Sequence, residues 1–330
     1  MSTDTLSEVL RALRLTGAVY FDVRAIAPWV AEAPPAALVG PQILPSADHV
    51  IEYHVVTSGS CYAGLLDGAP VLLEQGDIVV FPQGDAHVMS SAPGMRHPPD
   101  LGDYRRDAAL PFVLNLGDGD ADPASLVCGF LGCDARPFNP VLATLPRMLV
   151  VRGRGANTMR EHLVQVAVAE SKQRRAGGEC ALSRLSELLF IEVIRDFLAE
   201  LPAESASWLG GLRDPTIGRA LSALHGRPAH GWTLDELARE VGASRSVLAE
   251  RFNYYAGVPP MQYLAQWRMQ LAAHLLRDGA AGIAEIAQQV GYASEAAFSR
   301  AYKRLVGVAP ALWRQGVRSG ENVPTNTLSS

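Results

Sequence analysis

The spacing of hydrophobic and polar residues changes along the chain, and it predicts different secondary structure in successive regions. Residues 5–15 repeat apolar side chains at helical intervals, which predicts a short amphipathic helix packed on its own domain. Between residues 20 and 150, short apolar runs such as VIEYHVV and PFVLNL are separated by Gly, Pro and Asp, which predicts a sandwich or barrel of β-strands. Two helical patterns broken at RRAGGE follow in residues 157–200, and residues 215–315 are helical throughout.

The helical C-terminal third contains an internal repeat. The stretch LDELAREVGASRSVLAERFNYYAGVPP aligns with IAEIAQQVGYASEAAFSRAYKRLVGVAP, so that Gly242 matches Gly291. In each copy a small helix ends at the glycine, and Ser244 or Ser294 stands where it can cap a second helix by accepting a backbone N–H. This arrangement predicts a helix-turn-helix, whose second helix lies in the major groove of DNA. The alternative is a plain helical bundle with coincidental repeats.

Charge is distributed unevenly along the chain and favours the first of these alternatives. Residues 212–318 hold 13 Lys and Arg against 8 Asp and Glu, a net charge of +5, whereas the remainder holds 16 against 26, a net charge of −10. A basic module attached to an acidic remainder is typical of a nucleic-acid-binding protein. At 330 residues, of which 48% are hydrophobic, the chain can bury two or three domain cores.

Residues 213–315 resemble the DNA-binding domain of the AraC/XylS family of transcriptional regulators, and GYASEAAFSRAYKRLVGVAPALWR is very close to the most specific motif of that family. The resemblance implies sequence-specific binding to a promoter operator in double-stranded DNA, and contact with RNA polymerase if the protein is an activator. It also implies that the helix MQYLAQWRMQLAAHLLRD joins the two helix-turn-helix units, so that they address neighbouring major-groove segments on one face of the DNA.

The resemblance places base-reading positions on the second helix of each repeat, where the charged residues have distinct expected roles. Arg300 can reach a guanine edge, whereas Lys303 and Arg304 are better placed for phosphates. The family often has arginine where this chain has Glu250, which can accept from a cytosine or pair with a neighbouring arginine on the protein. The candidate DNA-binding residues are Arg245, Ser246, Ala249, Glu250, Arg251, Glu295, Ala296, Ala297, Arg300, Lys303 and Arg304. The aromatic residues expected in the core are Phe252, Trp267, Tyr302 and Trp313.

The N-terminal region resembles the cupin-type sensor found in one branch of the same family. The stretch GDIVVFPQGDAHVMSS follows the second cupin motif from Gly76 through Pro82 and Gly84 to His87, with Ser91 in place of the final asparagine. The stretches YHVVTSGSCY, VCGFLGCD and LPRMLVVRG carry further resemblance to this branch. The resemblance implies a β-barrel that binds a small effector, and we expect no cofactor.

The predicted strand HVIEYHVV helps to decide whether the barrel is an effector-binding sensor or an enzyme. We expect His54, Cys61 and His87 to bind the effector, whose identity the sequence does not give. A metal-dependent cupin enzyme needs an HXH pair and a glutamate, but this strand has His49, Glu52 and His54 at other spacings. Glu52 and His54 share one face of a strand, so a partial metal site with His87 stands beside the simpler hypothesis of polar residues hydrogen-bonded in a ligand pocket.

Four cysteines at irregular spacing do not indicate a disulfide framework, which favours a reducing compartment and a cytoplasmic protein. Cys128 and Cys133 form a CX4C pair that, with Cys61 and a histidine, is a candidate for zinc binding or oxidant sensing. Buried, unreactive thiols are the alternative. No apolar run approaches the roughly 20 residues that span a bilayer, and the N-terminus has the wrong order of charges for a signal peptide, so we expect no membrane role.

Together these features predict a multidomain α+β protein with a cupin-like barrel, a helical dimerisation segment and an all-α domain with two helix-turn-helix motifs. We expect a non-enzymatic, one-component regulator that forms a homodimer through the apolar faces of residues 157–200. The alternatives are a metal-dependent cupin enzyme with an appended DNA-binding domain, and a thiol or zinc redox sensor. The expected parts are the effector-sensing domain with the N-terminal helix (1–150), the dimerisation segment (151–205), a linker (206–214), the DNA-binding domain (215–316) and a flexible tail (317–330).

Overall fold

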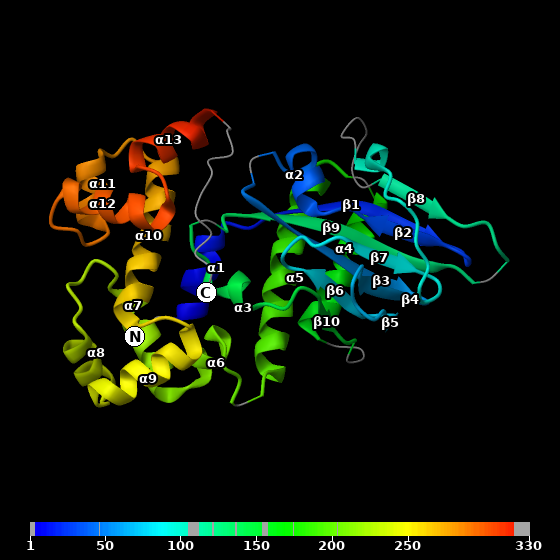
Figure 1. The fold of residues 1–330 in the computed structure, drawn as a ribbon. Coiled ribbons are helices and arrows are strands. Elements are labelled where there is room, and N and C mark those ends of the chain that lie inside the picture. Colours follow the sequence, from blue (N-terminus) through cyan, green and yellow to red (C-terminus); the bar gives the residue numbers. More distant parts are fainter. Residues whose placement is uncertain are drawn as a thin grey trace. The chain divides into compact units, whose positions relative to one another are not determined.

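The chain folds into two compact units that are interleaved in the sequence. The computed structural model describes residues 4–45, 47–104, 112–120, 122–135, 137–153, 158–173, 175–202 and 204–319. The described residues of 15–134 and 145–199 form the sheet unit, and those of 1–14, 135–144 and 200–330 form the helical unit (Figure 1). The chain therefore passes from one unit to the other four times.

The sheet unit contains two β-sheets in the part of the chain described above. A six-stranded sheet has the order β10-β6-β3-β9-β1-β8, and a four-stranded sheet has the order β2-β7-β4-β5. Neighbouring strands are antiparallel except for β1 and β8, which are parallel. The strands are β1 (Thr16–Ala25), β2 (Val30–Ala33), β3 (His49–Ser58), β4 (Ser60–Leu65), β5 (Val71–Glu74), β6 (Ile78–Phe81), β7 (His87–Ser90), β8 (Phe112–Leu116), β9 (Ala124–Cys133) and β10 (Leu149–Val151).

The two sheets share one hydrophobic core, which confirms the predicted β-rich N-terminal region. Alternate residues of the larger sheet, including Val56, Phe81 and Leu126, pack in the same cluster as Cys61 and Met89 of the smaller sheet. Because side chains alternate between the faces of a strand, the intervening residues of the larger sheet point to its other face. The even-numbered residues of β3 and β9 thus point into the interior between the sheets.

The other face of the six-stranded sheet is covered by α4 (Met159–Gln173) and α5 (Gly178–Glu200), and Figure 1 shows α5 running beside the strands. Tyr53 of β3 is 2.6 Å from Ser186 of α5 in a buried hydroxyl–hydroxyl hydrogen bond, and Val127 of β9 packs on Leu182. Large apolar side chains on these helices remain exposed, namely Met159, Val166 and Leu188. Leu182, Leu189, Phe190, Val193 and Ile194 of α5 are buried, whereas the apolar side chains of α4 are exposed or half-buried. Homodimerisation stays a prediction.

The cupin-like turn between β6 and β7 has the geometry that its sequence predicts. Gly84 has φ +67°, and a Cβ at this position would lie 2.7 Å from Ala36 Cβ and 2.8 Å from the Val50 carbonyl oxygen. Only glycine fits such a left-handed and crowded position without strain. Ala36 opens α2 (Ala36–Ile43), and a short 3₁₀ helix, η1 (Leu101–Tyr104), completes this unit among the described residues. The turn brings His87 at the start of β7 towards the interior.

The helical unit consists of helices from three separate stretches of sequence. They are α1 (Thr5–Leu13), α3 (Pro140–Thr144), α6 (Trp208–Arg213), α7 (Pro215–Gly226), α8 (Leu234–Val241), α9 (Arg245–Ala256), α10 (Pro260–Asp278), α11 (Ile283–Gln289), α12 (Glu295–Val306) and α13 (Pro310–Ser319). The joining helix α10 has 19 residues, or about 28 Å at 1.5 Å per residue, and it contacts α9, α11, α12 and α13. No helix in the described part of the chain is both long enough and apolar enough to cross a membrane.

The N-terminal helix packs on α7 and α10 of the helical unit, contrary to the expectation that it packs on the β-rich domain that follows it. Its apolar face is fully used there, because Val9 and Leu13 have no exposed surface. Arg14, directly after α1, extends the contact through an ion pair with Asp278 at the end of α10. An amphipathic pattern shows that one face of a helix is buried but does not identify the surface that buries it.

Residues 206–214, expected to be a linker, instead contain α6 and are part of the helical core. Trp208 is buried, and its indole N–H donates to the Tyr263 hydroxyl at 2.7 Å. Ser207 caps α6 by accepting the Gly210 N–H. The Pro, Ser and Gly content of this stretch therefore reflects a tight helix start and close packing. Of the expected tail, residues 317–319 belong to α13, and residues 320–330 lie outside the described residues.

His225 makes the stability of the helical unit depend on pH. Its Nε2 is 2.7 Å from the Tyr263 hydroxyl, and burial lowers its pKa to about 3. Since an unfolded histidine titrates near 6.5, the stabilisation from neutral His225 is fully present above that pH and is lost as the pH falls towards 3. We expect stability to fall more steeply below pH 6.5 in the wild type than in His225→Gln, by up to about 1.4 kcal/mol per pH unit. Urea unfolding at several pH values measures the free energy of unfolding of both proteins. If it fell with pH at the same slope in the wild type and in His225→Gln, the prediction would be contradicted.

Candidate nucleic-acid interface and ligand site

The two repeats form the predicted helix-turn-helix units. In the first, α8 ends at Gly242 with φ +67° and α9 begins after Ser244. In the second, α11 is followed by Gly291 with φ +86° and α12 begins after Ser294. Both serines cap their helices by accepting a backbone N–H from three residues ahead, at 3.3 and 3.2 Å. The predicted turns and caps are thus confirmed in both copies.

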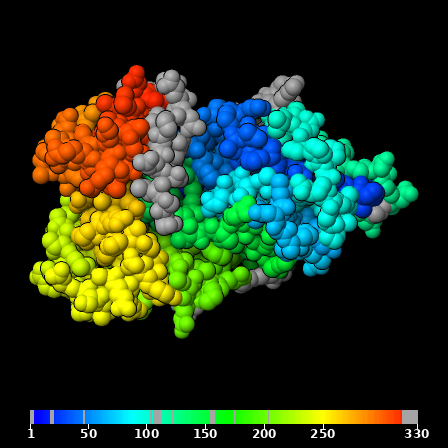
Figure 2. All heavy atoms as spheres, in the orientation of Figure 1, coloured from blue at the N-terminus to red at the C-terminus, as the bar shows by residue number. Residues whose placement is uncertain are grey.

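The buried side chains fix which face of α9 and α12 is turned outward. Leu248 and Phe252 of α9, and Phe298 and Tyr302 of α12, have no exposed surface. Trp267 and Trp313, the other predicted core residues, are each 1% exposed. The opposite faces of α9 and α12 therefore point to solvent, and Figure 2 shows the segments that carry them, in yellow and orange, at the surface.

The candidate DNA-binding residues lie on these outward faces. All are exposed except Ala249 and Ala297, which are half-buried. Arg300, Lys303 and Arg304 of α12 form no ion pair with an acidic side chain among the described residues, although most of the other arginines that the structure describes do, as Arg147, Arg160 and Arg227 show. Because these three cations are not neutralised within the protein, they are available to an external polyanion.

The first helix-turn-helix differs from the second because two of its arginines form ion pairs with acidic side chains of the protein. Arg245 is 3.1 Å from Asp235, and Arg251 pairs with Asp214, the residue that caps α7. Glu250 is exposed, and the structure shows neither of the pairings with Arg245 or Arg251 that were its expected alternative to DNA contact. The outward surface of α9 is therefore less cationic than that of α12.

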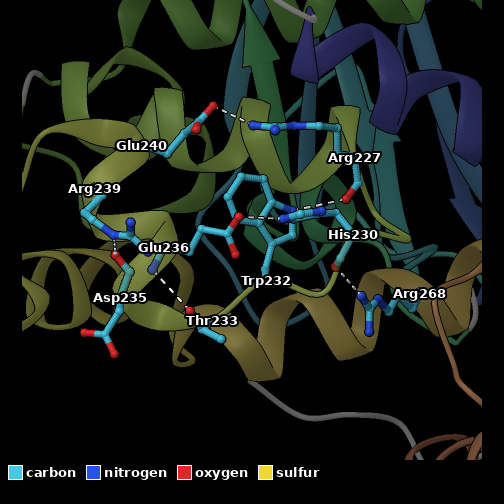
Figure 3. Close-up of polar contacts among 9 residues, drawn as sticks. All are labelled: Arg227, His230, Trp232, Thr233, Asp235, Glu236, Arg239, Glu240 and Arg268. Carbon is cyan, nitrogen blue, oxygen red and sulfur yellow. Dashed lines mark hydrogen bonds and ion pairs between the residues drawn. The ribbon is translucent and has the colours of Figure 1, made fainter.

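A loop between α7 and α8, residues 227–232, contacts the joining helix through polar groups that the sequence did not indicate (Figure 3). The Arg227 guanidinium lies 4.5 Å from the ring centre of Trp232, whose indole N–H donates to the Arg227 carbonyl. Arg268 of α10 donates to the His230 carbonyl at 2.8 Å, as Figure 3 shows. It also donates to the Pro228 carbonyl at 2.7 Å. The single Arg268 side chain thus holds this loop against α10.

The same loop also meets the second helix-turn-helix. A Cβ added to Gly291, in the turn between α11 and α12, would lie 2.6 Å from the Ala229 carbonyl oxygen. Arg268 lies 5.7 Å from the ring centre of Tyr292. The two helix-turn-helix units are therefore connected by this loop as well as by α10. These connections restrict the positions of α9 and α12 relative to each other.

In the sheet unit, Glu52, His54 and His87 converge in the interior. His54 Nε2 is 2.7 Å from His87 Nε2, and Glu52 Oε2 is 3.9 Å from the same nitrogen. The three side chains are at most 8% exposed. Glu52 and His54 come from β3 of the larger sheet and His87 from β7 of the smaller one, so the cluster bridges the two sheets.

Burial keeps this cluster uncharged at neutral pH. It raises the pKa of Glu52 to about 8, lowers that of His87 to about 4, and lowers that of His54, to which the nearby His87 also contributes. The His87 Nδ1–H donates to the Asp85 carbonyl at 2.9 Å, because a carbonyl oxygen can only accept. Phe81 stacks on the His87 ring at 3.6 Å between centres. The backbone and Phe81 thus fix the His87 tautomer and orientation.

The candidate cysteines do not come together as one site. Cys128 is directly opposite His54 in the β3–β9 pairing, and Cys61 belongs to the same interior core. Cys133 lies five residues after Cys128 on the continuous strand β9, so it points to the other face about 17 Å away. The predicted CX4C zinc pair is therefore not formed. Burial raises the pKa of the Cys61 thiol to about 12 and raises those of Cys128 and Cys133, which disfavours the reactive thiolate form of all three.

The sheet unit also contains a cavity that the sequence did not predict. It has a volume of about 650 Å³ and lies between α4 and the turns that end β3 and β5. Its lining includes Thr57, Gly76, Gln165 and Lys172, together with Arg160, which is 2% exposed and ion-paired with Asp196 at 2.7 Å. This volume is suitable for a small organic ligand. The side chains come from segments about 100 residues apart, so no local pattern could indicate the cavity.

Comparisons with known proteins match both halves of the chain. A family model described as cupin matches residues 4–199, and one described as a helix-turn-helix domain matches residues 237–316. A protein of Streptomyces lividans named as an AraC-like transcription regulator is 33% identical, covering 82% of this chain and 88% of that protein. The HTH-type transcriptional regulator AlkR of Acinetobacter baylyi is 30% identical, covering 94% of this chain and 99% of AlkR.

Among solved structures, the DNA-binding domain of AdpA in complex with a target DNA is 26% identical. It covers 34% of this chain and 99% of its own, with a TM-score of 0.31. The Streptomyces lividans protein and AlkR, which cover 82% and 94% of this chain, match it across both the sheet unit and the helix-turn-helix units.

Proposed function

The chain belongs to the AraC family of DNA-binding transcriptional regulators, with an N-terminal cupin domain, and from this we propose that it is a one-component regulator controlled by a small effector bound in the sheet unit. The DNA-binding part of the proposal rests on Arg300, Lys303 and Arg304 of α12, which are exposed and form no ion pair with any acidic side chain that the structure describes, in an otherwise acidic chain. Selection from a random duplex library tests it. We expect two enriched half-sites about 10 base pairs apart, one for each unit, and the absence of any enriched sequence would contradict the proposal.

The proposed effector site is the sheet interior beside His54, Cys61 and His87. Two observations support it. The cluster bridges both sheets, and β9, which carries Cys128 opposite His54, runs directly into residues 135–144 of the helical unit. In that segment the Phe138 N–H donates to Gln270 of α10 at 3.0 Å. A ligand that moves β9 therefore acts on the joining helix through a short, continuous stretch of chain.

The cavity beside α4 is a second candidate for the effector because of its volume, and two variants distinguish the sites. A metabolite that raises the melting temperature of the wild type is first identified by screening. At 100 times its Kd such a ligand contributes about 2.7 kcal/mol. We expect His87→Gln to abolish this shift and Ala169→Trp, which fills the cavity, to retain it. The reverse result would place the effector beside α4.

We also propose that the protein is a homodimer formed through α4 and α5, supported by the exposed apolar side chains of Met159, Val166 and Leu188. Sedimentation of the full chain and of Val166→Lys tests this, with the variant expected to shift towards the monomer. An unchanged dimer would place the interface elsewhere. If the regulator is an activator, RNA polymerase is a further partner.

A further inference from the structure

We propose that Arg268 of the joining helix is a positioning residue that sets the spacing of the two half-sites in the operator, because it holds the loop of residues 227–232 between the two helix-turn-helix units. The inference rests on the proposed function, since it concerns how both units bind one operator. It adds to that function by assigning operator spacing to a residue that lies outside α9 and α12.

The joining helix α10 connects two separate cores. Tyr263 in its first half packs edge-on against Phe252 of the first helix-turn-helix, with 5.4 Å between the ring centres. The buried residues of α10 from Met269 onward pack in the core of the second helix-turn-helix together with Phe298. Arg268 lies where these two sets of contacts meet. Because long helices curve, α10 alone fixes the angle between the two cores less firmly than it does with a further contact at this junction.

The loop between α7 and α8 is fastened to the first helix-turn-helix. Arg227 forms an ion pair with Glu240 of α8, and His230 Nε2 lies 2.7 Å from Glu236 Oε1 on the same helix (Figure 3). Both pairs are partly exposed and therefore weak individually. Trp232 at the end of the loop is only 6% exposed, and its burial anchors the loop more firmly. The loop is therefore part of the first helix-turn-helix.

The same loop reaches the turn of the second helix-turn-helix. A Cβ added to Gly291 would lie 2.6 Å from the Ala229 carbonyl oxygen and 2.7 Å from the Ala229 Cα. The matching glycine of the first copy, Gly242, has no atom within 4 Å of its Cβ position. The two copies of the repeat thus differ here, because only the turn of the second one is in backbone contact with the loop.

Arg268 holds the loop in the place where it makes this contact. The side chain is half-buried, and its guanidinium donates to the Pro228 carbonyl at 2.7 Å and to the His230 carbonyl at 2.8 Å. These two carbonyls flank Ala229, the residue that meets the second helix-turn-helix. The guanidinium also lies 5.7 Å from the ring centre of Tyr292 in that turn. Since hydrogen bonds from a charged donor are stronger than neutral ones, one side chain fixes the loop on both sides of its contact.

Units that are fixed relative to each other make the spacing of the half-sites matter. Each base pair added between the half-sites moves the second one about 3.4 Å along the DNA and about 34–36° around it. Two rigidly connected units lose base contacts when the spacing changes, whereas units joined through α10 alone can adjust to it. Arg268 thus acts on specificity through the loop and not through a DNA contact of its own.

Binding of the full-length protein to its selected operator, and to forms with one base pair inserted or deleted between the half-sites, tests the proposal. In the wild type the altered spacing should weaken binding about 5- to 150-fold, the cost of losing about one base contact. In Arg268→Ala this spacing penalty should be at least about fivefold smaller. A loss of folded protein would lower the affinity for every spacing alike, so the ratio of affinities reports the positions of the units and not stability.

Arg277→Ala is the matched control, since it removes an arginine of the same helix about 13 Å further along α10. We expect this variant to keep the wild-type spacing penalty.

A pair of glycine variants tests the same contact from its other side. Gly291→Ala and Gly242→Ala both place a Cβ at a position with positive φ, +86° and +67°, but only the Cβ at position 291 meets the loop. We expect Gly291→Ala to reduce the spacing penalty and Gly242→Ala to leave it unchanged. This comparison provides the test if Arg268→Ala does not fold.

An unchanged spacing penalty in folded Arg268→Ala or in folded Gly291→Ala would overturn the inference and leave the proposed regulatory function standing. A wild type that binds all three spacings equally would overturn it as well. The absence of any selected operator would instead contradict the proposed function itself, and the inference with it.

Discussion

Leu13→Ala should lower the free energy of unfolding of the helical unit by about 2–5 kcal/mol, the range for removing a fully buried leucine side chain. Leu13 has no exposed surface, and its helix packs on α7 and α10, which belong to the DNA-binding half of the chain. Leu312→Ala is the control, because Leu312 is in the same unit but 59% exposed. We expect that variant to change stability by less than about 0.5 kcal/mol.

Urea unfolding followed by tryptophan fluorescence measures this effect selectively. Most tryptophans belong to the helical unit, namely Trp208, Trp232, Trp267 and Trp313. Replacing Trp29 of the sheet unit by phenylalanine makes the signal specific. Equal midpoints for Leu13→Ala and Leu312→Ala would show that α1 does not stabilise the helical unit.

The position of α1 changes what is expected of a truncated protein. A fragment of residues 207–330 keeps both helix-turn-helix units, so we expect it to bind DNA without responding to the effector. It lacks α1 and residues 135–144, however, and therefore exposes the apolar surface that Val9, Leu13 and Val141 cover. We expect this fragment to be less stable than the same helices in the full chain.

Local signals explain why the helix-turn-helix units could be predicted from the sequence. Gly242 and Gly291 permit turns with positive φ, and Ser244 and Ser294 cap helices within three residues of themselves. Each of these features is determined by neighbours in the sequence, and the repeat supplied every one of them twice. The glycine turn at Gly84 was predictable for the same reason.

Features that depend on distant segments could not be predicted in this way. The sequence indicated that α1 is amphipathic, but its partner is α7, about 200 residues away. The spacing of Cys128 and Cys133 is compatible with a zinc pair only if the chain turns between them, and it continues as one strand. Strand alternation correctly placed Glu52 and His54 on one face, but the 2.7 Å contact with His87 required the packing of two sheets.

Arg300→Ala should remove about 1–3 kcal/mol of discrimination at one base pair of the operator, whereas Lys303→Ala should weaken binding to all sequences. Arg300 is exposed two residues after the buried anchor Phe298 and has no acidic partner among the described residues, so its guanidinium is free to make a bidentate contact with guanine. Lys303 lies in the last turn of α12, further from the end that enters the groove.

Binding isotherms with operator variants at several salt concentrations separate these two roles. Loss of the Lys303 phosphate contact should reduce the salt dependence by about one counterion, while Arg300→Ala should change the order of preference among operator variants. Arg239→Ala is the control, since Arg239 is on α8 and its Nε–H donates to the Asp235 carbonyl. If Arg300→Ala weakens every variant equally, Arg300 contacts phosphate, and specificity in the second unit must come from the small residues Ala296 and Ala297 and from Glu295 at the start of α12.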